Sequence, residues 1–142
     1  MNISSFESAV HGQIDLLNDG QPLEALDQYF ALDGLMYSND QLFATGKDQA
    51  RQKQEHYILA AQSIKGRIED LKTDAAHQVC IFRNCSSFVL GDGSEHQIDG
   101  LCWQQWSDGK VEIERYFDAE MMAEHLLNGL VQDPARLAAL AG

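Results

Sequence analysis

The 142-residue chain contains only three cysteines and two prolines, and it has no long apolar run. Cys80, Cys85 and Cys102 are an odd number without CxxC spacing, so we predict reduced thiols and neither a disulfide framework nor a metal site. No stretch approaches the ~20 apolar residues that span a bilayer, so no membrane contact is expected. The first five residues lack the charged and apolar parts of a signal peptide, which favours a cytoplasmic location.

Basic residues are also scarce. Ten Lys and Arg residues stand against 22 Asp and Glu residues, and the formal net charge is -12. Such a chain repels the phosphates of nucleic acids and anionic lipid surfaces, so neither is expected as a partner. No His, Asp and Glu residues have the spacing of a metal-ligand set, and we expect no cofactor.

The first part of the chain has helical periodicity. Apolar residues recur at three- and four-residue steps in Ile3–Asn18, in a segment from Pro22 to Asp33-Gly34, and in about Lys47–Ser63. These three segments are predicted helices. Two short strands, 35–37 and 42–44, are expected between the second and the third.

The second part of the chain has the alternating pattern of strands. Four are predicted, and the turns between the last three are Gly91-Asp92-Gly93 and Asp108-Gly109, which indicates a long antiparallel meander. Asp118 is expected to cap a helix of about 119–130. The chain is predicted to be one domain, 1–142, with a helical C-terminal extension from about 131. The four strands are about Arg67–Asp74, His77–Leu90, Glu95–Trp106 and Lys110–Phe117.

Helices gathered early and antiparallel strands gathered late are typical of an α+β fold. We expect a curved antiparallel sheet wrapped around the N-terminal helices, giving a cone-shaped barrel with an interior pocket. The open face of such a sheet would suit a homodimer.

The order of these elements and four short motifs resemble the SnoaL-like proteins of the nuclear-transport-factor-2-like superfamily, the cystatin-like α+β cones. The resemblance covers about residues 3–128, and it implies a cone with an interior pocket that is usually homodimeric. Members include polyketide cyclases, ketosteroid isomerases, limonene epoxide hydrolases, dehydratases and non-catalytic binding proteins, so the fold does not decide the function. The motifs are Leu26–Tyr29-Phe30–Asp33-Gly34, Gly46-Lys47, Asp108-Gly109-Lys110-Val111 and Tyr116-Phe117-Asp118.

The chemistries of this family match the chain unequally. The epoxide hydrolases would need carboxylates where this chain has Cys85 and Arg115, which makes their reaction improbable. Asp40 loosely matches the base of the ketosteroid isomerases, but the tyrosine expected on the first helix is missing. The SnoaL-type cyclases, which use an acidic residue or a histidine in an apolar cavity, are closer in pattern.

Strand periodicity groups Arg83 and Arg115 with apolar residues that would face the cavity. Two guanidinium groups there would suit a carboxylate, enolate or phosphate ligand. The alternative is that they pair with Glu69, Asp99 or Glu114 as cross-strand ion pairs. Asp99 is therefore either an acid/base group or the partner of Arg83.

Two functions remain open. The first is a small-molecule-binding protein, extending to a cofactor-free isomerase, cyclase or dehydratase acting on an apolar or aromatic acidic substrate. In this interpretation Asp40 and Asp99 move protons and Arg83 and Arg115 stabilise negative charge. The second is a non-catalytic dimeric ligand-binding or protein-interaction module. The residues expected to contact a ligand, whose aromatic members would serve a core equally well, are Tyr29, Tyr57, Cys85 (with a lowered pKa beside Arg83), Trp103 and Ile113.

Overall fold

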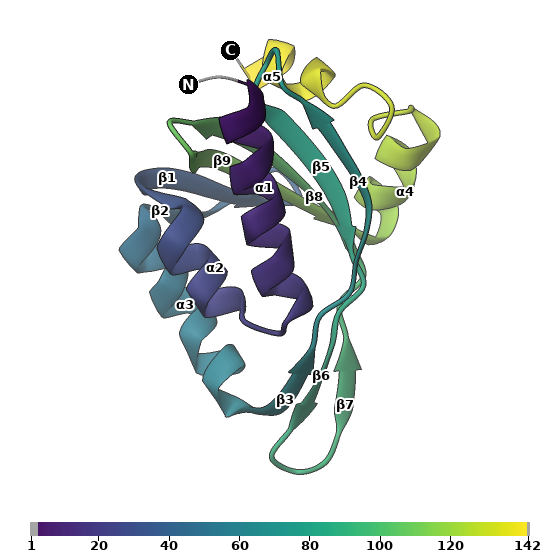
Figure 1. The fold of residues 1–142 in the computed structure, drawn as a ribbon. Coiled ribbons are helices and arrows are strands. Elements are labelled where there is room, and N and C mark those ends of the chain that lie inside the picture. The colour runs from purple at the N-terminus through teal and green to yellow at the C-terminus, as the bar shows by residue number, and fades with distance from the viewer. Residues whose placement is uncertain (1–2, 142) are drawn as a thin grey trace.

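The computed structural model describes residues 3–141. Three helices lie on one side of a curved sheet, and two C-terminal helices lie on the other side (Figure 1). Among the described residues, no helix is long and apolar enough to cross a membrane. The helices are α1 (Ile3–Asn18), α2 (Pro22–Tyr29), α3 (Lys47–Ala60), α4 (Ala119–Leu127) and α5 (Ala135–Ala141).

The main sheet has six strands in the order β2-β1-β9-β8-β5-β4. Neighbouring strands are antiparallel except β1 and β9, which run parallel. The sheet curves but is not closed, because its edge strands β2 and β4 do not pair with each other within residues 3–141. A second sheet has the order β3-β6-β7. The strands are β1 (Phe30–Ser38), β2 (Gln41–Thr45), β3 (Ala61–Lys65), β4 (Ile68–Asp74), β5 (Val79–Asn84), β6 (Ser87–Leu90), β7 (Glu95–Gln97), β8 (Gly100–Ser107) and β9 (Lys110–Asp118).

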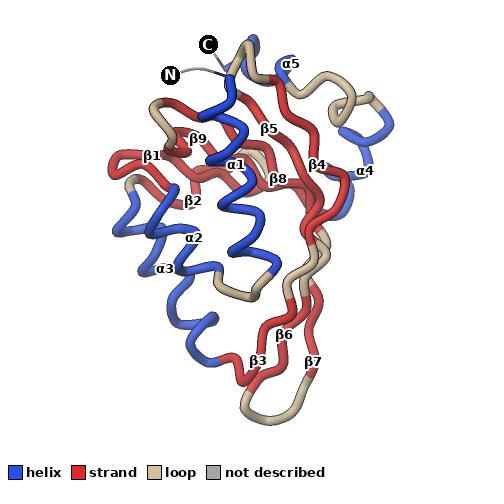
Figure 2. Tube along the Cα trace, in the orientation of Figure 1, coloured by secondary structure: helices blue, strands red, loops and turns tan. Residues whose placement is uncertain are grey.

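The α+β class and the curved sheet around N-terminal helices are confirmed, but two of the long predicted strands are each divided in two. The chain bends between β5 and β6 and again between β7 and β8, and the smaller sheet projects away from the larger one (Figure 2). Hydrogen bonds continue across the bend, from Cys85 N to Arg67 O (2.8 Å) and from Ile98 N to Ser86 O (2.7 Å). The strands therefore turn together as one ribbon.

The third helix ends at Ala60, three residues before the predicted end. The following residues form β3, where Ser63 lies opposite Val89 and Ile64 opposite Phe88 of β6. A strand satisfies the backbone polar groups of these residues as well as a helix would. Pairing with a strand more than twenty residues away therefore decides their structure against the local helical periodicity.

A β-bulge changes the direction of side chains along β9. Gln105 lies opposite Ile113 and Trp106 lies opposite Val111, so Glu112 is an extra residue without a partner on β8. An inserted residue reverses the alternation of side chains beyond it. Val111 accordingly packs in the inner core while Phe117, six residues later, packs in the outer one.

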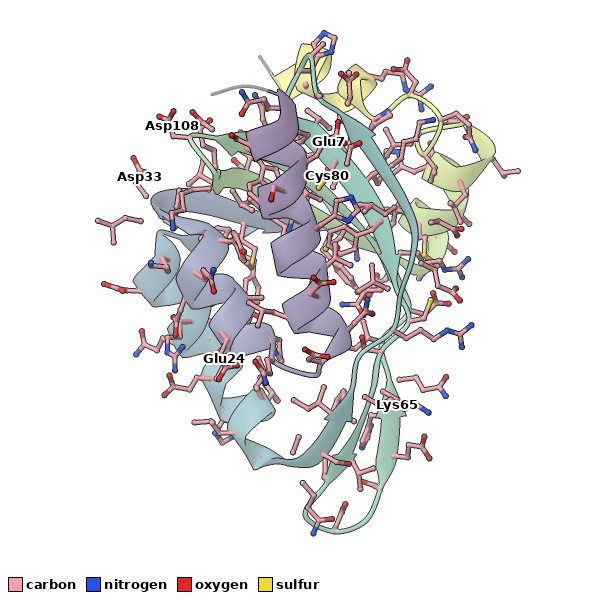
Figure 3. All side chains as sticks on the ribbon, viewed as in Figure 1. Glu7, Glu24, Asp33, Lys65, Cys80 and Asp108 are labelled. Carbon is pink, nitrogen blue, oxygen red and sulfur yellow. The ribbon has the colours of Figure 1, made fainter. Side chains whose placement is uncertain are left out.

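The sheet separates two apolar clusters. The inner cluster joins α1, α2 and α3 to the sheet and contains Phe6, Val10, Phe30, Phe82 and Trp106. Cys80, labelled in Figure 3, belongs to it and lies on the sheet beside α1. The outer cluster lies under α4, α5 and the segment between them, and contains Val79, Ile81, Leu101, Trp103, Phe117 and Leu130.

The outer face of the sheet is therefore occupied by the chain itself. Trp103 is 0 % exposed, and its indole Nε1 donates a hydrogen bond of 2.7 Å to Pro134 O, which holds the C-terminal segment against the sheet. The expected open face is covered at its centre. The homodimer stays a prediction, and a contact on this side would have to use the C-terminal helices or the margins of the sheet.

Candidate active site

A cavity of about 800 Å³ lies between the inner face of the sheet and helices α1–α3. This volume falls within the ~300–1,000 Å³ typical of small-molecule sites. Tyr57 and Ile58 of α3 and Ile64 of β3 line it together with Phe88 of β6, so it reaches the junction with the smaller sheet. The wall is mainly apolar, and its larger members include Leu26, Phe30, Met36, Phe43, Phe82 and Ile98.

Few charged side chains interrupt this wall. Among the described residues, Glu114 is the only carboxylate in it and Lys53 the only side chain that bears a positive charge. Lys53 is exposed, and its ammonium donates a hydrogen bond of 2.6 Å to Phe43 O. The remaining polar lining is uncharged, and apart from Tyr57 it comes from Gln13, Ser38, Gln54, Asn84, Cys102 and Tyr116.

Glu114 is held by a glutamine that is itself fixed by several partners. The amide Nε2 of Gln104, which is 1 % exposed, donates to Glu114 Oε1 over 2.7 Å. The amides of Gln104 and Gln13 of α1 form a reciprocal pair, with both hydrogen bonds 2.8 Å long. Trp106 Nε1 (3.2 Å) and Cys80 Sγ (3.4 Å) also donate to Gln104 Oε1.

The environment of Glu114 favours its neutral form. Burial raises the pKa of this carboxyl above its ordinary value of 4.5, and the hydrogen bond from Gln104 offsets the rise only in part. Within the described part of the chain, no lysine, arginine or histidine forms an ion pair with Glu114. A carboxyl without a cation beside it, in an apolar wall, is suited to donate a hydrogen bond or a proton.

Tyr116 lies two residues further along the same face of β9 and also lines the cavity. Burial is the main cause that raises the pKa of its phenol to about 12, so the hydroxyl stays protonated at neutral pH. The thiol of Cys102 lies in the same wall, and burial raises its pKa well above 9.0. A thiol held protonated in this way is a poor nucleophile.

The structure brings only one of the nine residues singled out from the sequence, Tyr57, to the cavity wall. Tyr57 is 69 % exposed and stacks edge-on against His56, so it belongs to the margin of the site rather than to its interior. Asp40 is exposed in the turn between β1 and β2, with a φ of 65°.

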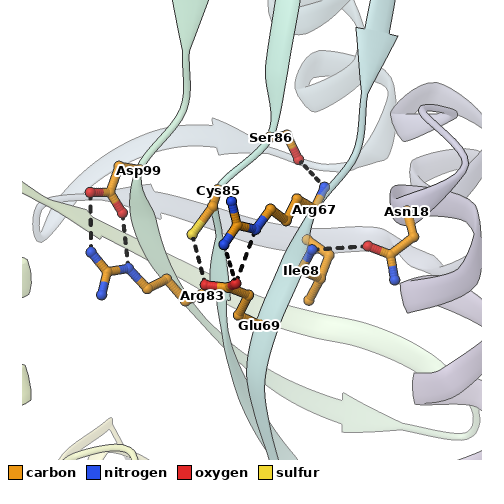
Figure 4. Close-up of polar contacts among 8 residues, drawn as sticks. All are labelled: Asn18, Arg67, Ile68, Glu69, Arg83, Cys85, Ser86 and Asp99. Carbon is orange, nitrogen blue, oxygen red and sulfur yellow. Dashed lines mark hydrogen bonds and ion pairs between the residues drawn. The ribbon is translucent and has the colours of Figure 1, made fainter.

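Arg83 and Asp99 form a bidentate ion pair outside the cavity, with N···O distances of 2.9 and 3.1 Å (Figure 4). The guanidinium lowers the pKa of Asp99. The alternative interpretation of Asp99, as the cross-strand partner of Arg83, is therefore what the structure shows.

Arg115 does not face the cavity either, which corrects the orientation expected from strand periodicity. Its guanidinium lies over the ring of Tyr37, 4.5 Å from the centroid, and 5.9 Å from that of Trp103. The reason is the bulge at Glu112, which places Glu114 and not Arg115 on the inner face. Sequence reasoning considered Glu114 only as a partner for arginine. No pattern in the sequence marks the bulge.

The other expected ligand contacts belong to packing. Trp103 and Ile113 lie in or against the outer cluster, and Tyr29 packs on Trp106 with ring centroids 5.9 Å apart. Cys85 contacts Glu69, and burial with this contact raises the pKa of its thiol, the reverse of the expected lowering (Figure 4). No group of three His, Cys, Asp or Glu side chains within residues 3–141 could hold a metal ion.

Comparison with known proteins gives a consistent structural result. No family model matches the sequence, and no curated protein matches it. A SnoaL-like protein from Mesorhizobium loti, provisionally assigned as a polyketide cyclase, is 19% identical, with a TM-score of 0.65 over 83% of this chain and 100% of that one. An NTF2-like protein of unknown function from Exiguobacterium sp. 255-15 is 20% identical, with a TM-score of 0.62 over 79% and 98%.

The chain has the SnoaL-like, NTF2-like fold. A third similar structure, TerC, was co-crystallised with polyporic acid; it is 9% identical, with a TM-score of 0.62 over 91% of this chain and 99% of TerC. The fold expected from the motifs is thereby confirmed. At these sequence identities a shared SnoaL-like fold does not indicate which reaction is catalysed, so the function has to be argued from the cavity itself.

Proposed function

We propose that this SnoaL-like chain binds a largely apolar small molecule that bears a carbonyl oxygen, and that Glu114 donates a proton or hydrogen bond to that oxygen. The observation that carries the proposal is a carboxyl in the wall of an apolar cavity of about 800 Å³, without a cation partner among the described residues. The crystallisation of TerC, a protein of the same fold, with polyporic acid supports a small-molecule ligand.

The same carboxyl can complete a proton cycle. Glu114 gives its proton to the carbonyl oxygen and becomes a carboxylate, and this carboxylate then removes a proton from the carbon next to the carbonyl. The products are the enol and a neutral Glu114, so all protons are accounted for by one residue. Enolisation is the first step shared by isomerisation, by cyclisation through a carbon nucleophile and by dehydration next to a carbonyl. Tyr116 is a second donor from the same face of β9.

The ligand proposed here is less acidic than the one expected from the sequence. Neither Arg83 nor Arg115 lines the cavity, and Lys53 is exposed and bonded to Phe43 O. A carboxylate placed beside Glu114 would lack a counter-ion and would raise the free energy of the complex. A neutral ketone or quinone fits the interior better.

A pair of probes tests the proposal. 2-Acetylnaphthalene and 2-ethylnaphthalene have similar shapes, but only the first has a carbonyl, and both affinities are measurable by calorimetric titration. We expect the ratio of the two affinities to favour the ketone by about tenfold more in the wild type than in Glu114→Leu, the value of one hydrogen bond in an apolar site. Glu114→Gln, whose amide also donates, should keep the preference but lose its dependence on pH. An identical ratio in the wild type and Glu114→Leu would refute the proposal.

Binding without chemistry is the second candidate, because the cavity offers a single carboxylate among the described residues. Deuterium exchange distinguishes the two. An enolising enzyme should exchange the acetyl protons of 2-acetylnaphthalene in D₂O faster than buffer does, and Glu114→Gln should abolish this rate while still binding the ketone. Ketone binding without any excess exchange would leave the non-catalytic function.

A further inference from the structure

The amide of Gln104 is held in one orientation by its partners. Its Oε1 accepts from Trp106 Nε1, Gln13 Nε2 and Cys80 Sγ, all of which act as donors. The indole N–H of Trp106 can only donate, so turning the amide over would place its NH₂ group against this donor and make the contact repulsive, whereas the Gln13 amide and the Cys80 thiol could reverse their roles. Nε2 of Gln104 therefore has to point to the acceptors Gln13 Oε1 and Glu114 Oε1.

The two oxygens of Glu114 consequently differ. Oε1 accepts from Gln104, so in the neutral acid it is the carbonyl oxygen. No hydrogen-bond partner of Oε2 is found among the described side chains and backbone groups. Unlike Gln78 Oε1, which also lacks a partner, Oε2 is not completely enclosed by protein atoms. Because Glu114 lines the cavity, Oε2 is the oxygen open to it.

We infer that Gln104, clamped by Gln13, is a positioning residue that places the acidic proton of Glu114 on Oε2, where it faces a ligand in the cavity. This inference rests on the proposed function and specifies Oε2 of Glu114 as the oxygen that carries the donated proton. It also limits the ligand, because the group that meets Oε2 has to be a hydrogen-bond acceptor. A carbonyl or ether oxygen satisfies this condition, and an ammonium group does not.

Two thiols and a phenol on the sheet around Glu114 have raised pKa values. Burial raises the pKa of Cys80 of β5 to about 12 and that of Cys102 of β8 well above 9.0, and the pKa of Tyr116 on the same strand as Glu114 is about 12. Gln13 of α1 and Ser38 of β1 carry no charge. Lys53 and Tyr57 line the cavity from α3. The substitution Lys53→Met, introduced into the wild type and into each variant, removes the lysine charge from the comparison.

The test removes the clamp as a pair. Gln13→Met with Gln104→Met eliminates both amides at nearly constant volume, so neither amide is left without the other, while Trp106 Nε1 loses its acceptor. Gln13→Met alone leaves the contact from Gln104 to Glu114 and serves as the second variant should the double one not fold. The probes are again 2-acetylnaphthalene and 2-ethylnaphthalene, titrated over a range of pH.

In the double variant we expect the ketone preference to fall by about three- to tenfold, with hydrocarbon affinity nearly unchanged. The midpoint of the pH dependence should move upward, because a hydrogen bond that stabilises the carboxylate is lost. The infrared carbonyl band of neutral Glu114, assigned by its absence in Glu114→Gln, should move to higher frequency. Gln13→Met alone should produce intermediate changes.

The failures of the two proposals are distinguishable. If the wild type shows no ketone preference beyond that of Glu114→Leu, the proposed function fails. If the wild type shows the preference, but the double variant keeps it together with the midpoint and the infrared band, the assignment to Gln104 fails while the proposed function stands. Equal loss of ketone and hydrocarbon affinity with an unmoved band would reduce Gln104 to a structural residue and overturn the inference.

Discussion

The ring of Tyr116 lies directly against the backbone of Gly100, on the neighbouring strand of the sheet. A Cβ added at Gly100 would overlap both the ring carbons and the hydroxyl of Tyr116. Glycine at this position, which is buried, thus makes room for an aromatic side chain of the cavity wall.

Gly100→Ala should displace Tyr116 and destabilise the fold by about 1–3 kcal/mol, as overpacking of a tight site does. The displaced ring also has to enter the cavity, so affinity for 2-acetylnaphthalene should fall. Denaturant unfolding and calorimetric titration measure the two effects. Gly91→Ala is the matched control, because an added Cβ there meets nothing within 4 Å; equal effects of the two variants would contradict the packing argument.

Glu114 should make the stability of the wild type fall with pH relative to Glu114→Gln. The pKa of this carboxyl is raised in the folded state, so its contribution is complete below the ordinary value of 4.5 and is lost as the pH rises through the folded pKa. The difference in unfolding free energy should change by up to about 1.4 kcal/mol per pH unit within that window. Denaturant titrations from pH 4 upward measure it, and a constant difference would mean that Glu114 is not perturbed.

Breaking the ion pair between Arg83 and Asp99 should have little effect on the free energy of unfolding and none on ketone binding. Asp99 has more than half of its side chain exposed, and such pairs contribute roughly 0–1 kcal/mol. Because Arg83 lowers the pKa of Asp99, this contribution exists above the ordinary pKa of aspartate and is lost as the pH falls below it. A double-mutant cycle with Arg83→Met and Asp99→Asn measures the pair, and neither variant should alter ketone binding. A clear loss of affinity for the ketone would mean that Arg83 and Asp99 contribute to ligand binding.

Leu130 should anchor the C-terminal segment to the outer face of the sheet. It is 0 % exposed in the outer cluster, so Leu130→Ala should reduce the free energy of unfolding by about 2–5 kcal/mol. Leu127, three residues earlier, is 88 % exposed, and Leu127→Ala should stay within about 0.5 kcal/mol of the wild type. Thermal and denaturant unfolding compare the two, and similar values would mean that the segment does not pack as described.

Much of the order of elements was accessible from local pattern. Asp108 and Gly109 have φ values of 52° and 77°, as a tight hairpin turn between β8 and β9 requires. Pro22 begins α2, and helix α1 has the bounds that its apolar periodicity indicates. These features depend on residues a few positions apart, which is why a single sequence contains them.

Other features depend on partners far along the chain. Asp118 precedes α4 as expected, but its side chain forms no cap; it accepts a hydrogen bond of 2.7 Å from Asn39, 79 residues away. The end of α3 is set by the pairing of β3 with β6. No local pattern carries either contact.

The candidate site shows the same division more sharply. The sequence by itself determined that β9 is a strand with two unlike faces, following a tight turn and leading into a helix. Only the tertiary structure decided which face is inward, because the unpaired Glu112 reverses the alternation that the sequence suggests, turning Glu114 toward the cavity and Arg115 away. The raised pKa of Glu114 likewise depends on burial, which exists only once the helices cover the sheet, and its contact with Gln104 depends on the pairing of Gln104 with Gln13, 91 residues distant.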